Sequence, residues 1–173
     1  MNFHELLESE EFHDAVENKI PTYFKIEEPD IDWNDIFVML DEDVKNKKPY
    51  GKKVYSGFAF RLWHVDRLPY LKEIMNHIYT YFYPYEIAEC MLYASLTTEK
   101  GNFGGEHKDE EEVLFWQAHG KSEWIISDDN GNTVFKKVLE KNDVVYCPGN
   151  MTHEVIPITP RLGFSLGFIE RKK

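Results

Sequence analysis

The sequence predicts a mainly β fold, a sandwich or barrel, joined to an N-terminal part that is helical with some β structure. The second half contains β-branched and aromatic runs separated by turn residues, which is typical of strands. The first half instead carries apolar residues at helical spacing. The 173 residues include 12 Phe, 10 Tyr and 4 Trp, enough large side chains for a substantial core. We therefore expect residues 1–173 to form one domain.

Two stretches of the N-terminal half predict amphipathic helices. The first has Asp32 as its N-cap, and the second has Pro69 in its first turn, where proline is tolerated. A weaker helix is expected over residues 1–20, and a strand over residues 54–63 with Phe58, Phe60 and Leu62 on one face. The helical stripes that we expect in the core are Trp33, Ile36, Phe37, Leu40 and Val44, and then Leu68, Leu71, Ile74, Met75, Ile78 and Phe82.

The C-terminal half predicts a series of strands. Residues 86–97 alternate between an apolar row and a polar row, and the polar row is expected to face either solvent or a pocket. Residues 121–126 and 133–139 flank Asn130-Gly131, a strong hairpin signal. A further strand, residues 144–147, follows a turn at Asn142-Asp143 and ends at Pro148-Gly149.

His107, Asp109 and His153 form the most informative pattern in the chain. If residues 107–109 are extended, His107 and Asp109 project to the same face while Lys108 points away. His153 opens the strand after Pro148-Gly149. Two histidines and one carboxylate are the facial triad that holds a non-heme Fe(II) and leaves other coordination positions open. The pattern therefore predicts a metal site for redox catalysis more than a structural one.

The segment around the first two of these residues resembles the first motif of the cupin superfamily. Gly101, His107 and Gly120 fit that motif, and Asp109 stands in place of its second histidine. The glutamate of the motif falls on or beside the apolar Val113 and Leu114. The four metal ligands of the cupin motifs would therefore be reduced to three in this sequence.

The segment around His153 resembles the second cupin motif. Pro148 and His153 keep its spacing, Asn142 stands at its first glycine, and the second glycine is shifted by one place to Gly149. Together with Asp109, this is similar to the Fe(II)/2-oxoglutarate oxygenases and their Jumonji-C-like branch, as is the strand–turn–strand of residues 115–124. The resemblance implies a double-stranded β-helix (jelly-roll/cupin) core over residues 86–169, with residues 1–85 as a helical and β elaboration.

The resemblance also implies a cation for the far carboxylate of 2-oxoglutarate. The usual Lys or Arg of the Jumonji-C-like branch is replaced by Ser122, and Lys121 would face the wrong side of a regular strand. Residues 153–165 are similar to the end of prolyl-hydroxylase-type oxygenases, which makes Arg161 the expected partner, with Ser165 on the same face of its strand. An arginine suits this task because its planar fork pairs with a carboxylate through two hydrogen bonds. Tyr93 is expected to donate its hydroxyl to the same carboxylate.

The function that follows is a hydroxylase that uses Fe(II), 2-oxoglutarate and O2, with His107, Asp109 and His153 as metal ligands and catalytic centre. Its substrate would be a peptide or protein side chain, or a small molecule. One alternative is a metal-dependent cupin, a small-molecule dioxygenase or isomerase that does not use 2-oxoglutarate. Another is a cupin-fold binding protein without enzymatic activity, in which the polar cluster is a satisfied core network.

Charge and cysteine usage limit the partners and the compartment. The net charge is −11, and an acidic surface repels a phosphate backbone, so no nucleic-acid partner is expected. No apolar run is long enough for a membrane span, and the acidic N-terminus does not predict a secretory signal. Cys90 and Cys147 are expected to be reduced core thiols, which favours the cytoplasm. Of the other histidines, His119 is the nearest to the motif without being an expected ligand, and His64 is expected to border the pocket.

Overall fold

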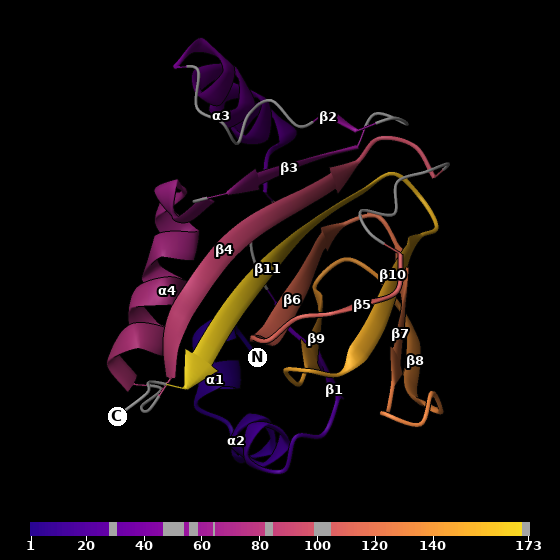
Figure 1. Cartoon of the computed structure of the whole chain (residues 1–173). Helices are drawn as coiled ribbons and strands as arrows, with labels where there is room; N and C mark the ends of the chain where they lie inside the picture. Colours follow the sequence, from indigo (N-terminus) through magenta and orange to yellow (C-terminus); the bar gives the residue numbers. More distant parts are fainter. Residues whose placement is uncertain are drawn as a thin grey trace.

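Two antiparallel sheets pack face to face in the computed structural model of the chain, and they confirm the predicted fold class (Figure 1). The larger sheet has the order β1 (Thr22–Lys25), β9 (Asp143–Cys147), β6 (Glu112–His119), β11 (Arg161–Glu170), β4 (Tyr85–Ser95), β3 (Ala59–Trp63) and β2 (Val54–Tyr55). The smaller sheet has the order β5 (His107–Lys108), β10 (Thr152–Pro157), β7 (Ser122–Ser127) and β8 (Thr133–Leu139). The structure describes residues 1–27, 31–46, 54–55, 59–63, 65–81, 85–98 and 105–170.

Two N-terminal predictions need correction. The expected helix over residues 1–20 is two helices, α1 (Phe3–Leu7) and α2 (Glu10–Glu17), because the Ser9 side chain accepts a hydrogen bond from the Phe12 amide and starts a new helix. The expected single strand over residues 54–63 is an antiparallel pair, since β2 pairs with β3. Phe58 lies outside the described residues, whereas Phe60 and Leu62 are both buried. Strands β1 to β3 thus extend the larger sheet, and the expected boundary near residue 85 stays a prediction.

A large apolar core lies between the helices and the outer face of the larger sheet. Helix α4 (Pro69–Tyr81) buries Leu71, Ile74 and Ile78 completely, and it begins at the proline that the sequence placed in its first turn. Among the described residues, no helix has the length and apolar character to cross a membrane. Further members of this core are Phe3, Leu6 and Phe12 from α1 and α2, and Trp116, Tyr146, Phe164 and Phe168 from the sheet.

Helix α3 (Trp33–Lys45) has the predicted N-cap, with Asp32 accepting a hydrogen bond from the Asn34 amide. Its apolar stripe is only partly in the core, however. Ile36 is fully buried, but Phe37 and Val44 are 46% and 52% exposed. The helix stands at the edge of the molecule (Figure 1), so only one side of it can pack on the core.

The strand β11 runs through the centre of the larger sheet, where it pairs with β4 and β6 (Figure 1). Its side chains alternate between the two faces, as the period of a strand requires. Leu162, Phe164, Leu166 and Phe168 belong to the helix-covered core. Arg161 and Ser165 instead line a pocket between the sheets, so the same strand builds the core and one wall of the site.

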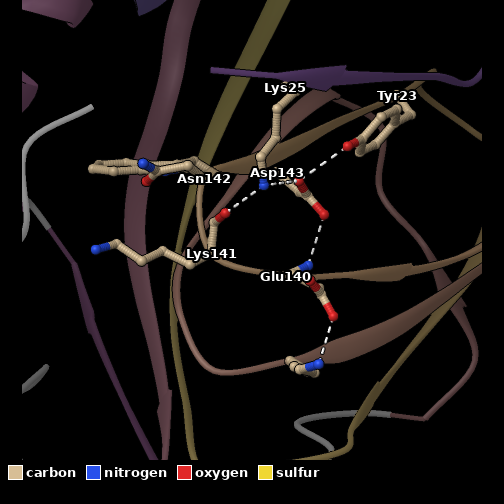
Figure 2. A network of polar contacts seen from close by, with 8 residues as sticks. Tyr23, Lys25, Glu140, Lys141, Asn142 and Asp143 are labelled. Carbon is tan, nitrogen blue, oxygen red and sulfur yellow. Dashed lines mark hydrogen bonds and ion pairs between the residues drawn. The ribbon is translucent and has the colours of Figure 1, made fainter. Parts of the chain in front are cut away.

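A buried polar network fixes the β1 edge to β9 (Figure 2). The Asp143 carboxylate is almost fully buried and accepts hydrogen bonds from Lys25 Nζ at 2.6 Å, the Tyr23 hydroxyl at 3.0 Å and the Glu140 amide at 2.7 Å. Asn142 precedes it with a φ of 66°, in the left-handed region that asparagine tolerates better than most residues. This conformation explains how Asn142 can stand where the cupin motif has glycine.

Candidate metal centre and cosubstrate pocket

His107 and His153 face each other across two paired strands at the open end of the smaller sheet. Strand β10 pairs with β5 so that His153 lies directly opposite His107, and their ring centroids are 4.4 Å apart. Asp109 follows β5 immediately and turns its carboxylate to the same place. Lys108 points away and pairs with Asp129 at 2.8 Å, as the expected alternation of an extended segment requires.

The ligand atoms of these three residues lie within 4.8 Å of one another. Asp109 Oδ2 is 3.4 Å from His153 Nε2 and 3.8 Å from His107 Nε2. The His153 side chain is only 4% exposed, whereas those of His107 and Asp109 are 45% and 39% exposed. The cluster is therefore anchored in the interior on one side and open to a ligand on the other.

Each histidine of the cluster has its second ring nitrogen next to a backbone carbonyl. His107 Nδ1 lies 2.9 Å from the Gly105 oxygen, and His153 Nδ1 lies 3.3 Å from the Met151 oxygen. An Nδ1–H that donates to a carbonyl leaves the Nε2 lone pair for a metal. Burial, together with the neighbouring His107, lowers the pKa of His153, which favours the neutral imidazole that a metal needs.

The loop that leads into His153 is tied to Asp109 and to the start of β6. The Asn150 amide donates to the Asp109 carbonyl at 2.7 Å, and the Gly149 amide donates to the Glu112 carboxylate at 3.2 Å. Gly149 also lies so close to this segment that an added Cβ would be 2.6 Å from the Glu110 oxygen. The two halves of the cluster, more than forty residues apart in the sequence, are thus held together by the protein alone.

A pocket between the two sheets opens beside the cluster. It is lined by the three residues of the cluster, by the predicted Tyr93, Arg161 and Ser165, and by apolar side chains that include Phe115, Trp124 and Val155. The Trp124 ring stacks on that of His153 with an interplanar angle of 11°. The pocket therefore combines a possible metal site with an apolar, partly enclosed wall.

Arg161 is a buried cation at the inner wall of this pocket. Its side chain is 2% exposed, and within the described part of the chain its Nε and Nη1 atoms have no hydrogen-bond partner. Burial lowers the pKa of Arg161 to about 10, so the guanidinium is still charged at neutral pH. A buried charge without a partner is costly, and an anionic ligand would remove that cost.

Tyr93 lies on β4 near Arg161. Burial raises the pKa of Tyr93 to about 12, with the charge of Glu89 as a smaller cause. The hydroxyl therefore stays protonated at neutral pH and can act as a hydrogen-bond donor. Tyr93, from the polar row of this strand, faces the pocket rather than solvent, which is one of the two possibilities that the sequence left open.

His119, Ser122 and Lys121, which were not expected to be metal ligands, lie outside the cluster. His119 Nε2 is 2.6 Å from the Ile31 oxygen, and its ring stacks on Trp33. Ser122 is buried and donates to the Gln117 side chain, while Lys121 pairs with Glu140 at the surface. His64 lies outside the described residues.

Arg61 and Trp124 are among the pocket residues that were not expected from the sequence. Arg61 reaches the pocket from β3, and Trp124 reaches it from β7. Alternation along residues 59–63 carried a signal for Arg61, because an arginine between buried Phe60 and Leu62 has to point to the other face of the sheet. Nothing in the sequence showed which strand would lie beside β4.

The two packed antiparallel sheets define the class of protein, a cupin fold, and the His-Asp-His cluster lines the pocket between them. Comparison with known families matches residues 63–173 to the JmjC domain, and the chain therefore belongs to the JmjC-domain family. This match confirms the recognised superfamily and the Jumonji-C-like branch. No curated protein matches the sequence significantly.

Solved structures of one bacterial protein show the same fold. A structure of YcfD, described as a ribosomal oxygenase from Escherichia coli, matches all of this chain and 52% of its own chain, with a TM-score of 0.65 and 16% identity. A second structure of ycfD matches 94% of this chain and 54% of its own, with a TM-score of 0.66 and 16% identity. A third, YcfD with cobalt and 2-oxoglutarate, aligns over 50% of this chain and 25% of its own, with a TM-score of 0.45 and 24% identity. The present chain spans about half the length of YcfD in the two more extensive matches.

Proposed function

We propose that this protein is an Fe(II)- and 2-oxoglutarate-dependent oxygenase that hydroxylates a peptide or protein side chain or a small molecule. The observation that carries the proposal is one pocket lined both by a His-Asp-His cluster and by the buried Arg161, whose Nε and Nη1 atoms have no hydrogen-bond partner among the described residues. Membership of the JmjC-domain family supports the same class.

The donor set of the cluster fits Fe(II). His107 and His153 would supply Nε2 and Asp109 a carboxylate oxygen, which makes two imidazoles and one carboxylate, the facial triad of non-heme Fe(II) oxygenases. When bound together, Fe(II), 2-oxoglutarate and O2 supply the oxidising chemistry, in which the substrate C–H becomes C–OH while 2-oxoglutarate and O2 yield succinate and CO2. His107, Asp109 and His153 would hold the metal on one side and leave its other side to the pocket.

The remaining residues of the pocket would bind and orient the cosubstrate. Arg161 would pair with its far carboxylate, which satisfies the buried guanidinium. Tyr93 would donate its hydroxyl to the same carboxylate, and Ser165 lies on the same wall. Phe115 and Trp124 would exclude water from the carbon chain between the two carboxylates. The protein would thus bind and orient the cosubstrate and exclude water from it, and the cofactors would supply the reactivity.

The experiment that tests this proposal is the anaerobic addition of Fe(II), followed by 2-oxoglutarate, with the visible absorption spectrum recorded after each step. A charge-transfer band that develops only when both are present would be the signature of a chelated cosubstrate. Binding of Fe(II) without that band, and without consumption of 2-oxoglutarate in air, would favour a cupin enzyme that uses another reaction. No metal binding after purification without chelator would favour a non-enzymatic binding protein.

Alanine variants of the histidines test the ligand assignment itself. His107→Ala and His153→Ala should abolish stoichiometric Fe(II) binding with little change in thermal stability, because the helix-covered core does not include the metal site. His119→Ala is the matched control and should bind Fe(II) like the unchanged protein, since its ring faces Ile31 and Trp33. Metal loss in His119→Ala together with metal retention in His107→Ala would reverse the assignment.

A further inference from the structure

We infer that Arg61 is a positioning residue, which holds the Tyr93 hydroxyl so that its proton points at the far carboxylate of the cosubstrate. This inference rests on the proposed function, because it concerns the same 2-oxoglutarate site. It assigns a task to a pocket residue from β3, a strand of the N-terminal half that the sequence pattern did not connect with the site.

The sheet places Arg61 and Tyr93 side by side. Strand β3 pairs with β4 so that Arg61 is directly opposite Tyr93, and β11 pairs with β4 so that Gly163 is opposite Tyr93 on its other side. Directly opposed residues of antiparallel strands have their Cβ atoms about 4.5–5.5 Å apart, within reach of each other's side chains. Arg61, Tyr93 and Arg161 all line the same pocket.

The hydrogen-bond chemistry of these side chains sets the direction of the Tyr93 proton. A guanidinium carries donors only, so in the hydrogen bond between Arg61 and Tyr93 the tyrosine oxygen has to be the acceptor. The Tyr93 proton is then directed away from Arg61. The Tyr93 hydroxyl lies 3.8 Å from the Met91 sulfur, a weak acceptor that a carboxylate oxygen would replace.

The other side of the pocket wall also presents donors. Arg161 is a second guanidinium, it interacts electrostatically with Tyr93, and two of its nitrogens lack partners among the described residues. A ligand with two acceptor atoms could bind the Tyr93 hydroxyl and Arg161 together. A carboxylate offers two oxygens and one negative charge, which matches one donor from each residue.

Arg61 is itself held in place from its own strand. Its guanidinium carbon lies 4.4 Å from the centre of the Trp63 ring, in a cation–π contact. An arginine can stack on an aromatic ring and donate in its plane at the same time, which a lysine ammonium does not do. We therefore expect the fork of Arg61, and not only its charge, to be needed for the orientation of Tyr93.

A double-mutant cycle tests this inference on the whole protein. The dissociation constant of 2-oxoglutarate is measured anaerobically from the charge-transfer band, with Fe(II) present, in the unchanged protein, Arg61→Met, Tyr93→Phe and the double variant. Loss of one hydrogen bond should weaken binding by roughly 3-fold to 10-fold in each single variant. Because Arg61 acts through Tyr93, the double variant should bind no more weakly than Tyr93→Phe alone.

Four further measurements separate this role from a structural one. Arg61→Lys should recover only part of the affinity, whereas Arg67→Met, which removes an exposed arginine from the short 3-10 helix Val65–Arg67, should bind 2-oxoglutarate like the unchanged protein. Pyruvate, which has no far carboxylate, should bind equally to the unchanged protein and to Arg61→Met. Thermal melting without ligand reports any loss of folding, and Arg61→Lys takes the place of Arg61→Met in the cycle if the latter does not fold.

The outcomes distinguish the inference from the function on which it rests. Additive losses in the double variant, or full affinity in Arg61→Met, would overturn the positioning role while 2-oxoglutarate binding by the unchanged protein upholds the proposed function. Full recovery in Arg61→Lys would also overturn it, because charge alone would then suffice. If the unchanged protein develops no band with 2-oxoglutarate, the proposed function fails first, and the inference falls with it.

Discussion

The two faces of the larger sheet use the same strands for opposite purposes. On the helix-covered face, the side chains of β11 are large and apolar, and among them Leu162 and Phe164 are completely buried. On the pocket face, the same strand carries Arg161, Gly163 and Ser165. Adjacent residues of this strand therefore belong to the same hydrogen-bonded sheet, but their side chains serve different purposes, one in the apolar core and the next in the pocket. The stability of the fold comes mainly from one face, and the ligand-binding chemistry is concentrated on the other.

This difference explains how the described part of the chain can bury the charge of Arg161 with two of its nitrogens unpartnered. Removing apolar area from water on the helix-covered face contributes about 25 cal/mol for each Å². The pocket face instead makes an unfavourable contribution to the free energy of folding. Arg161 is buried there, and two of its nitrogens have no partner in the described structure. A site of this kind can persist only on a scaffold whose stability is secured elsewhere.

The largest expected effect is a difference in stability between substitutions at two neighbouring residues of β11, one on each face of the sheet. Phe164→Ala should lower the free energy of unfolding by about 3–5 kcal/mol, since it leaves a cavity in the helix-covered core. Ser165→Ala, one residue further on, should lower it by about 1 kcal/mol or less, because only a small polar group is lost. Chemical denaturation of both variants measures the contrast. Equal losses in the two would contradict the division of labour between the faces.

The next effect concerns cosubstrate binding on the pocket face. Arg161→Ala should raise the apparent KM for 2-oxoglutarate on the order of 30-fold or more, because losing a partly buried charged pair costs about 2–5 kcal/mol. Fe(II) affinity should hardly change, and Arg161→Lys should recover only part of the loss. Lys121→Ala is the control and should resemble the unchanged protein, since Lys121 pairs with Glu140 at the surface. Identical 2-oxoglutarate kinetics in Arg161→Ala and the unchanged protein would refute this role.

A smaller effect is expected at Gly163, where the pocket wall allows no side chain. An added Cβ would lie 2.2 Å from Cζ of Phe115, so Gly163→Ala has to displace the Phe115 ring. Overpacking of this kind costs about 1–3 kcal/mol of stability. Binding of 2-oxoglutarate should weaken as well, because Phe115 lines the pocket.

The matched control for this overpacking is Gly163→Ala combined with Phe115→Leu. The smaller side chain gives the methyl group room, so the double variant should be more stable than Gly163→Ala alone. Denaturation midpoints of the single and double variants provide the measurement. A double variant that is less stable than both single variants would mean that the Phe115 ring is not the obstacle.

The smallest effect lies between α1 and α4, far from the pocket. Burial lowers the pKa of His77 below its ordinary value of 6.5, and the neighbouring His4 lowers it further. The His77 side chain therefore takes up a proton at a higher pH in the unfolded chain than in the folded protein. Its contribution to the free energy of unfolding is complete above pH 6.5 and falls as the pH drops below that value.

Substitution of His77 tests this pH dependence. His77→Gln should lose less stability than the unchanged protein when the pH is lowered from about 7.5 to about 5.5. His13→Gln, at an exposed position of α2, should keep the full loss. Thermal melts at the two pH values give the comparison, and an unchanged pH response in His77→Gln would rule out this source.

The fold and the assembly of the cluster were predictable because both depend on local patterns. The alternation of residues 86–97, the Asn130-Gly131 hairpin and the spacing around His107, Asp109 and His153 each describe a short segment of the chain. The structure brings the three residues of the cluster together, and their role as metal ligands stays a prediction. Arg161 and Tyr93, which the family resemblance singled out, also line the pocket, and their role toward a cosubstrate stays a prediction.

The parts that were wrong or missed depend on contacts between distant segments. The exposure of Phe37 and Val44 follows from where α3 packs, which its own periodicity does not reveal. Arg61 reaches the pocket only because β3 pairs with β4. The spacing of residues within a short segment does not predict the order of strands in a sheet. The break between α1 and α2 could have been predicted from the sequence, because Ser9 is a good N-cap. The prediction of one helix instead followed the apolar pattern, which continues across the break.

The hydrogen bond from the Asn150 amide to the Asp109 carbonyl has a consequence for metal selection. With both halves of the cluster already fixed, a metal ion finds the two imidazoles and the carboxylate assembled and pays little ordering entropy on entry. A rigid, open site with these donors discriminates weakly among divalent ions, whose affinities then rise from Mn²⁺ through Fe²⁺ to Cu²⁺. Zn²⁺ or Ni²⁺ would compete with Fe²⁺ at the proposed centre, so the metal found after purification should follow the ions present during expression.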